Sequence, residues 1–194
     1  MAETPRVLLL GDSIRMSYQP HVKLMLESKH EAVVTGPAEN CQYSGYTRER
    51  LPKWLDELGR PDVVHWNNGL HDVGHNPNRS PMQFPLEAYL DNLKAVLDML
   101  RKTGAKVIWA TSTPVHPNRP FRSDAWAWKN EEIDRYNGAA LELMREQHIP
   151  LNDLHAVVWS EVEACLAEDM LHLNKDGQKV CADAVVEAVR KVME

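Results

Sequence analysis

The chain has 194 residues, of which 43% are hydrophobic and 26% are charged, and its formal net charge is −6. This length and composition are typical of one soluble globular domain, here expected to span residues 1–194. The negative charge disfavours nucleic acid and anionic membrane as main partners, and no apolar run approaches the ~20 residues that a membrane span needs.

Apolar strands alternate with amphipathic helices along the chain. In chain order we expect a strand at Arg6–Leu10, a helix at Met16–Leu26, a strand at Ala32–Thr35, a helix at Glu49–Leu58, a strand at Asp62–Asn67, a helix at Leu86–Arg101, a strand at Lys106–Thr111, a helix at Lys129–Gln147, a strand at Pro150–Asn152 and a last helix capped by Asn174. Repeated strand–helix units favour right-handed crossovers, and therefore an α/β fold with a parallel sheet of about five strands covered on both faces.

Four long irregular segments separate these elements, at Gly36–Tyr46, Gly69–Pro85, Thr113–Trp128 and Val157–Leu173. The first three leave the carboxyl ends of predicted strands, as does the turn at Ser13. Ligands of open α/β sheets bind in the crevice at those ends. We therefore expect the chemistry of this protein to be found there.

The three cysteines, Cys41, Cys165 and Cys181, are odd in number and lack the spacing of a metal site. We expect buried free thiols. The first apolar run is too short for a signal peptide and has no basic segment before it. A cytoplasmic location is therefore expected, or secretion if a leader has been removed.

Two polar groups of residues suggest nucleophilic catalysis. Four apolar residues lead directly into Gly11-Asp12-Ser13, so a buried strand ends at a serine. Asp169 and His172 stand just before the last helix, and their spacing lets the carboxylate reach the imidazole within one turn. A serine hydroxyl becomes a nucleophile when a histidine takes its proton and a carboxylate orients that histidine. Each motif alone also fits an ordinary turn or helix cap.

Two further segments lie at the same predicted crevice. Ser44-Gly45-Tyr46-Thr47 marks the turn into the second helix, where a glycine allows close backbone approach and frees an N–H to face an anion. The run from Asn67 to Asp72 ends the third strand and supplies amide and imidazole donors.

Together these four motifs resemble, in the same order, the blocks of the SGNH (GDSL-type) serine hydrolases, from the first strand to the final helix. The resemblance implies a flavodoxin-like three-layer α/β/α fold and ester hydrolysis without a metal or another cofactor. By position it implies Ser13 as nucleophile, His172 as base and Asp169 as the group that orients it. The backbone N–H groups of Ser13 and Gly45 are then expected in the oxyanion hole.

The chain departs from the family at the third oxyanion donor. The family places an asparagine where this chain has His71, in Gly69-Leu70-His71-Asp72. A neutral imidazole can donate one N–H, so His71 is expected to replace the amide, with Asp72 fixing its tautomer. Alternatively, Asn67 or Asn68 supplies the donor, or the site is impaired. A metal site made of His71, Asp72 and His75 is a weaker alternative.

The residues expected to bind substrate are Asp12, Asn68, Arg122, Trp126 and Trp128. Indoles at the rim of a crevice can stack on sugar faces, and an arginine can hold a carboxylate. Either indole could instead pack beneath the loop. Trp54, Trp109 and Trp159 are expected in the core.

The sequence therefore predicts a serine esterase that removes a small acyl group, acetyl in the first instance, from a small molecule or an oligosaccharide. One alternative is a lipolytic esterase or thioesterase on short acyl chains. Another is a non-catalytic carbohydrate-binding protein on the same fold. A flavodoxin-like signalling or cofactor domain is disfavoured, because the chain has no glycine-rich phosphate loop.

Overall fold

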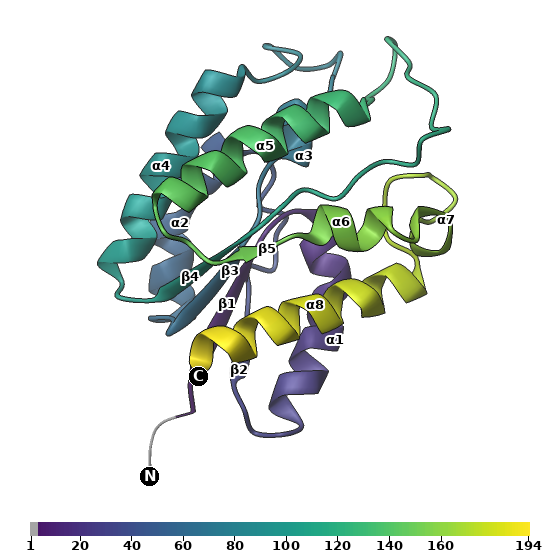
Figure 1. Cartoon of the computed structure of the whole chain (residues 1–194). Coiled ribbons are helices and arrows are strands. Elements are labelled where there is room, and N and C mark those ends of the chain that lie inside the picture. The colour runs from purple at the N-terminus through teal and green to yellow at the C-terminus, as the bar shows by residue number, and fades with distance from the viewer. Residues whose placement is uncertain (1–3) are drawn as a thin grey trace.

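The computed structural model describes residues 4–194 and contains one five-stranded sheet (Figure 1). The strands are β1 (Arg6–Leu10), β2 (Val33–Thr35), β3 (Val63–Trp66), β4 (Lys106–Ala110) and β5 (Leu151–Asn152). Their order across the sheet is β2-β1-β3-β4-β5, and each neighbouring pair is parallel. This confirms the predicted parallel sheet. All carboxyl ends meet at one edge, where the strand-to-helix loops begin.

Five long helices cover the two faces of the sheet, as predicted. They are α1 (Ser13–Glu27), α2 (Ser44–Leu58), α4 (Leu86–Lys102), α5 (Asn130–Glu146) and α8 (Lys175–Met193). Helices α1 and α8 pack together on one face, while α2 and α5 flank α4 on the other (Figure 1). The result is the three-layer α/β/α arrangement.

Three short helices lie outside the helices and strands that the sequence predicts. They are α3 (Leu70–Val73), α6 (Leu154–Trp159) and α7 (Val162–Cys165). Each has six residues or fewer, so none repeats an apolar position often enough to produce a helical period. Helices α1 and α2 also begin earlier than predicted, at Ser13 and Ser44. Both of these starts lie at the functional edge of the sheet.

The core is formed by the apolar strands and the inward faces of the helices. Trp54 and Trp109 are buried as predicted, but Trp159 is 46% exposed and stacks on the ring of His155, which corrects that expectation. The three cysteines are free and buried, as predicted.

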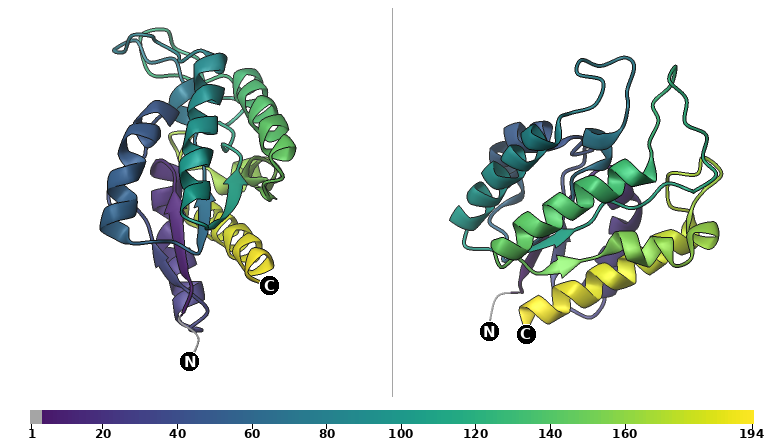
Figure 2. Two further views of the ribbon diagram at one scale, coloured as in Figure 1. Left: turned by 90° about the vertical axis from the view of Figure 1, so that its left-hand side faces the viewer. Right: turned by 45° about the horizontal axis from the view of Figure 1, so that its top comes forward.

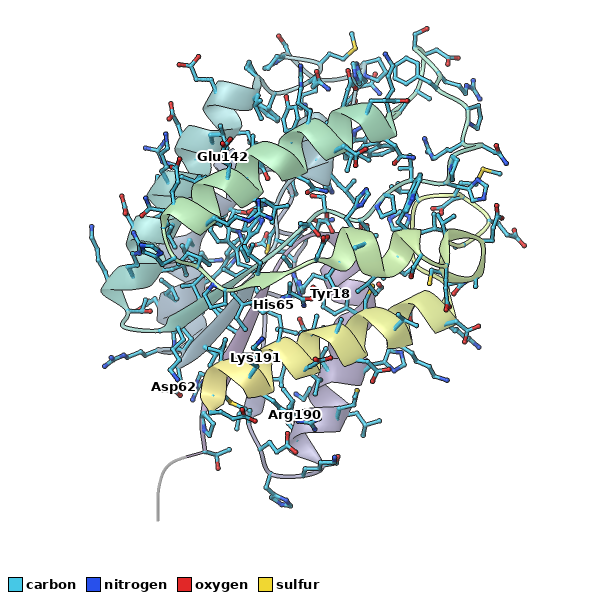
Figure 3. The ribbon with its side chains drawn as sticks, viewed as in Figure 1. Tyr18, Asp62, His65, Glu142, Arg190 and Lys191 are labelled. Carbon is cyan, nitrogen blue, oxygen red and sulfur yellow. The ribbon has the colours of Figure 1, made fainter. Side chains whose placement is uncertain are left out.

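One polar side chain inside the sheet is His65 of β3, which lies across from Tyr18 of α1 (Figure 3). Burial lowers the pKa of His65 to about 4. The imidazole is therefore neutral at pH 7, and its Nε2 accepts a hydrogen bond from the amide of Asn152 at 3.0 Å. His65 is a core residue and does not line the cavity in front of Ser13.

Two long loops project from the carboxyl edge of the sheet (Figure 2). One follows α3 and the other leads into α5. An antiparallel bridge between His75 and Ala127 joins them. None of the helices formed by residues 4–194 combines the length and apolar character that a membrane crossing requires.

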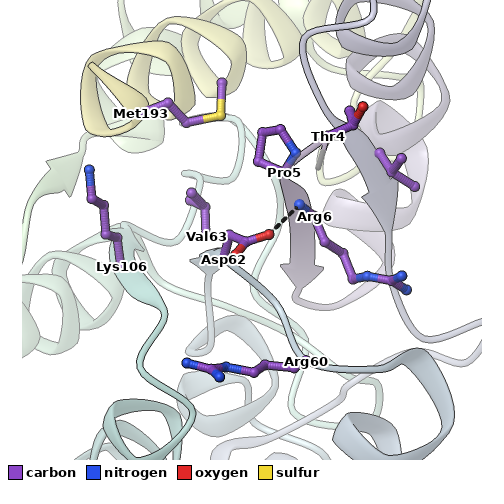
Figure 4. Close-up of a pocket in the computed structure, with 9 residues that line it drawn as sticks. Thr4, Pro5, Arg6, Arg60, Asp62, Val63, Lys106 and Met193 are labelled. Atoms are coloured by element: carbon purple, nitrogen blue, oxygen red, sulfur yellow. Dashed lines mark hydrogen bonds between the residues drawn. The ribbon is translucent and has the colours of Figure 1, made fainter. Parts of the chain in front are cut away.

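The opposite edge of the sheet carries a cavity of about 690 Å³ (Figure 4). Arg6, Arg60 and Lys106 line it, and each donates to a backbone carbonyl: those of Leu58, Thr103 and Val192, respectively. These cations tie the amino ends of the strands to the helices. The groups with catalytic chemistry lie at the other edge.

Candidate active site

Ser13 is the first residue of α1 and follows β1 after a two-residue turn. Asp12 is the N-cap of the helix, and its Oδ1 accepts the N–H of Ile14 at 2.9 Å. This cap explains why the helix begins at Ser13. The hydroxyl consequently stands at the carboxyl edge of the sheet, and the backbone N–H of Ser13 belongs to a helix N-terminus, where N–H groups favour negative charge.

A tight turn before α8 joins Asp169 and His172. Asp169 Oδ1 accepts the backbone N–H groups of Leu171 and His172, at 3.1 and 2.9 Å. Its Oδ2 lies 2.5 Å from Nδ1 of His172. Partial burial acts to raise the pKa of Asp169, but the hydrogen bonds from His172 and Leu171 outweigh it and hold that pKa below its usual value. The carboxylate is therefore ionised and oriented toward the imidazole.

The same imidazole reaches Ser13 across the sheet edge. His172 Nε2 lies 3.0 Å from Ser13 Oγ. With Nδ1 donating to Asp169, Nε2 is the acceptor for the serine hydroxyl. The structure thus brings Ser13, His172 and Asp169 into one hydrogen-bonded series, although 159 positions separate the serine from the histidine.

The start of α2 places Gly45 at the same edge. Ser44 donates its backbone N–H to both carboxylate oxygens of Asp72, at 3.0 and 3.1 Å, and its hydroxyl to Oδ1 at 2.6 Å. Asp72 was expected to fix the tautomer of His71, and that expectation is wrong: the carboxylate is occupied by Ser44. Burial raises the pKa of Asp72 to about 7.

His71 lines the cavity in front of Ser13. Burial lowers the pKa of His71 below its usual value, against the effect of the nearby Asp12 carboxylate, which raises it. The imidazole is therefore neutral at pH 7 and carries one N–H. Trp126 packs against it edge to face, with ring centroids 4.8 Å apart.

This cavity has a volume of about 270 Å³. Its lining combines polar groups with apolar walls: Asp12, Ser13, Ile14, Asn40, Leu70, His71, Trp126, Trp128, Leu171 and His172. Three of the residues expected to bind substrate, Asp12, Trp126 and Trp128, therefore line this cavity. Trp126 is half-buried, whereas Trp128 is 6% exposed and donates its indole N–H to the carbonyl of Leu70 at 2.7 Å. Trp128 is thus as much a core residue as a wall of the cavity.

Arg122 lies outside this cavity. It forms an exposed pair with Asp124 and lines a neighbouring cavity of about 360 Å³, which shares Trp126 with the first. Arg119 also lines that second cavity and donates to the backbone carbonyl of Asp169 at 3.2 Å.

Neither Asn67 nor Asn68 lines the cavity in front of Ser13. The amide of Asn67 donates to the carbonyl of Ala110, and that of Asn68 donates to Gln42 O and Thr47 Oγ1. Asn68 is 1% exposed, so its expected role in substrate binding is wrong. The proposed metal alternative is also contradicted, because Asp72 bonds Ser44 while His75 bonds Glu132.

Asn40 lines the cavity, although no sequence motif indicates it. Its sequence signal is weak: a polar residue in the loop that leaves the carboxyl end of the second strand. Such loops hold many polar residues, and only the folded position of Asn40 distinguishes it.

Comparison with known proteins identifies this fold. A chain from a lake metagenome, the α/β hydrolase enzyme LAE5 from Lake Arreo, Spain, superposes with a TM-score of 0.80 at 18% identity, covering 99% of this chain and 98% of the other. The acetyl xylan esterase AlAXEase superposes with a TM-score of 0.76 at 20% identity, covering 95% and 99%. At these identities the likeness concerns the fold.

A sequence relative is GDSL esterase/lipase WDL1 of Oryza sativa subsp. japonica, 22% identical over 171 residues, which cover 77% of this chain and 64% of the rice protein. This chain therefore spans less than two thirds of that relative. A model of the GDSL-like lipase/acylhydrolase family matches residues 9–180, from β1 into α8. The chain therefore belongs to the GDSL-like lipase/acylhydrolase family.

Proposed function

We propose that the protein is a serine esterase that removes a small acyl group, in the first instance acetyl, from a carbohydrate ester through an acyl-enzyme intermediate. The observation that carries this proposal is the hydrogen-bonded series from Ser13 through His172 to Asp169, which opens onto a cavity of about 270 Å³. The three side chains form a catalytic triad in this account.

In the first step, Ser13 Oγ attacks the ester carbonyl while its proton passes to Nε2 of His172. Asp169 accepts the Nδ1 hydrogen bond of the imidazolium that forms. The carbonyl oxygen becomes an oxyanion, and the backbone N–H groups of Ser13 and Gly45 donate to it. When the C–O bond breaks, the alcohol leaves with the proton from His172. Water then attacks the acyl-enzyme and loses a proton to the same nitrogen. As the bond between the acyl carbon and Ser13 Oγ breaks, His172 returns this proton to Oγ and the acid is released.

His71 is proposed as the third oxyanion donor. The His71 ring lines the cavity, and burial lowers its pKa, so the ring is neutral and can donate one N–H hydrogen bond. Asn67 and Asn68 do not line the cavity, and the Asn68 amide donates both of its N–H groups within the protein, so neither residue competes for this role. A donor of this kind acts on charge that exists only in the transition state and intermediate.

The preference for a small acyl group rests on the size and walls of the cavity. A volume of about 270 Å³ has to admit the ester group and part of the alcohol, so little space is left for a long acyl chain. Trp126 gives the rim an aromatic ring of the kind that packs on sugar faces. The similarity to an acetyl xylan esterase supports the same substrate class.

A labelling experiment and a substrate panel test this function. Mass spectrometry should show that a fluorophosphonate probe modifies Ser13. Acetylated xylo-oligosaccharides should give a higher kcat/KM than p-nitrophenyl esters, and activity on the latter should fall as the acyl chain lengthens. Activity that rises with chain length would instead indicate a lipolytic esterase or thioesterase. The absence of labelling at Ser13 would indicate a binding protein.

A further inference from the structure

Asn40 occupies a position that the proposed chemistry leaves without a role. It lies in the loop between β2 and α2, half-buried, and lines the same cavity as Ser13, His71 and His172. Gly45, whose N–H is proposed to face the oxyanion, is the second residue of α2, which this loop enters.

One hydrogen bond fixes how the Asn40 amide is oriented. Its Oδ1 accepts the backbone N–H of Gln42 at 2.7 Å. An N–H needs an acceptor, so the oxygen and nitrogen of this amide cannot be exchanged. The NH2 group is consequently the free end of the amide, and it donates to no protein group within residues 4–194. Asn40 therefore has a donor available at the cavity, whereas the Asn68 amide donates both of its N–H groups within the protein.

The backbone around Asn40 is tied to the turn that carries Ser13. Arg15 is 2% exposed, and its guanidinium donates to the carbonyls of Gly11, Pro37 and Glu39. On the other side of Asn40, the N–H of Cys41 donates to the carbonyl of Gly11 at 3.2 Å. Gly11 lies two positions before Ser13 in the sequence. These bonds therefore fix the position of the loop relative to the nucleophile.

We propose that Asn40 is a further catalytic residue, whose amide NH2 donates to the substrate's carbonyl oxygen as negative charge develops on it. This inference rests on the proposed serine mechanism. A neutral amide gains little from the carbonyl of the bound ester and much more from the oxyanion. Asn40, from the loop between β2 and α2, and His71, from α3, then both donate to the oxyanion, beside the N–H groups of Ser13 and Gly45.

The test is Asn40→Asp. The substitution keeps an oxygen for the N–H of Gln42 and removes the NH2, so the turn is retained while the donor is lost. We expect kcat on an acetyl ester to fall by about 10²–10³-fold, with KM changed only a few-fold. Asn40→Ala, which adds no charge, should lose about 10-fold or more in kcat.

Asn76→Asp is the matched control. Asn76 Oδ1 accepts the N–H of Asn78 at 3.0 Å, the same local turn, but Asn76 does not line the cavity. This control should keep wild-type kcat. Thermal melting identifies the folded variants, and Asn40→Ala decides the question if Asn40→Asp does not fold.

The proposal for Asn40 is overturned if folded Asn40→Asp or Asn40→Ala retains wild-type kcat. Fluorophosphonate labelling of the wild-type protein separates this failure from that of the proposed function. A wild type that is labelled at Ser13 and active, with variants equally active, removes only the role of Asn40. A wild type that is neither labelled nor active removes the esterase mechanism itself.

Discussion

The buried carboxyl group of Asp72 connects α3, the short helix that contains His71, to the start of α2. It accepts three hydrogen bonds from Ser44, so the position of Gly45 depends on a side chain two elements further along the chain. Because α2 begins with this contact, the orientation of the Gly45 N–H is set by tertiary structure and not by a local turn.

Asp72 should also make stability depend on pH. Burial raises its pKa from the usual 3.8 to about 7 in the folded state, so between these values the folded protein holds a proton that the unfolded chain has released. The stabilisation that this group contributes is full below the unfolded pKa and is lost as the pH rises through about 7. Asp72→Asn removes the titration.

Urea unfolding at about pH 5 and about pH 8 checks this expectation. The free energy of unfolding of wild type, relative to Asp72→Asn, should decrease from the lower pH to the higher. A relative stability that stays constant, or that increases with pH, contradicts the assignment.

A substitution series at His71 tests whether its ring donates a hydrogen bond. We expect His71→Ala to lower kcat by about 10²–10³-fold while KM changes little, because the donor acts on charge present only during reaction. His71→Asn should recover part of the loss, since an amide can also donate. His71→Phe keeps the contact with Trp126 but has no N–H, so it should resemble His71→Ala. If His71→Phe keeps wild-type kcat, His71 is a packing residue.

At the scale of elements, the strands and the long helices could be predicted from periodicity, but the starts of α1 and α2 could not. Asp12 caps α1 locally, and its sequence is equally typical of a turn. Ser44 begins α2 through Asp72, a contact across 28 positions that no local pattern contains. The short helix α3, which contains His71, has only four residues, so the sequence shows no helical periodicity there.

The same limit applies to the candidate site. The sequence motifs pointed to Ser13, Asp169 and His172, which the structure brings together. They also pointed to Asn68, whose amide N–H groups both donate to other protein groups, and they did not indicate Asn40. Distinguishing two asparagines in crevice loops requires knowing which amide already has a partner, and that depends on the fold.

The paired indoles of Trp126 and Trp128 depend on a glycine in the facing loop. Their ring centroids are 5.1 Å apart. A Cβ on Gly74 would lie 2.5 Å from Nε1 of Trp126 and 2.6 Å from Nε1 of Trp128, closer than such contacts allow. We expect Gly74→Ala to displace the indoles, lower the melting temperature and raise KM for an acetylated oligosaccharide more than for p-nitrophenyl acetate.

Gly138→Ala provides the control, because a Cβ at Gly138 in α5 would meet no atom within 4 Å. Alanine is favoured over glycine in a helix by about 1 kcal/mol, so this variant should be as stable as wild type or slightly more stable. Gly74→Ala with wild-type melting temperature and KM would show that the indole pair does not depend on this close contact.

At the scale of the whole molecule, the parallel sheet collects side chains from distant parts of the chain at one edge. Ser13 follows β1, Gly45 follows the loop after β2, and His71 follows β3. His172 arrives from the opposite end of the sequence on the turn before α8, which packs against α1. The alternation of strands and helices sufficed to predict this edge as the site of chemistry, because parallel strands end together.

The central claim is that Ser13 and His172 act as one catalytic unit, and a double-mutant measurement of kcat on an acetyl ester tests it most directly. Ser13→Ala and His172→Ala should each lower kcat by about 10⁴-fold or more, and the double variant should lose little further activity, because removing either member already disables the pair. Purified, folded Ser13→Ala that retains wild-type turnover would contradict the account.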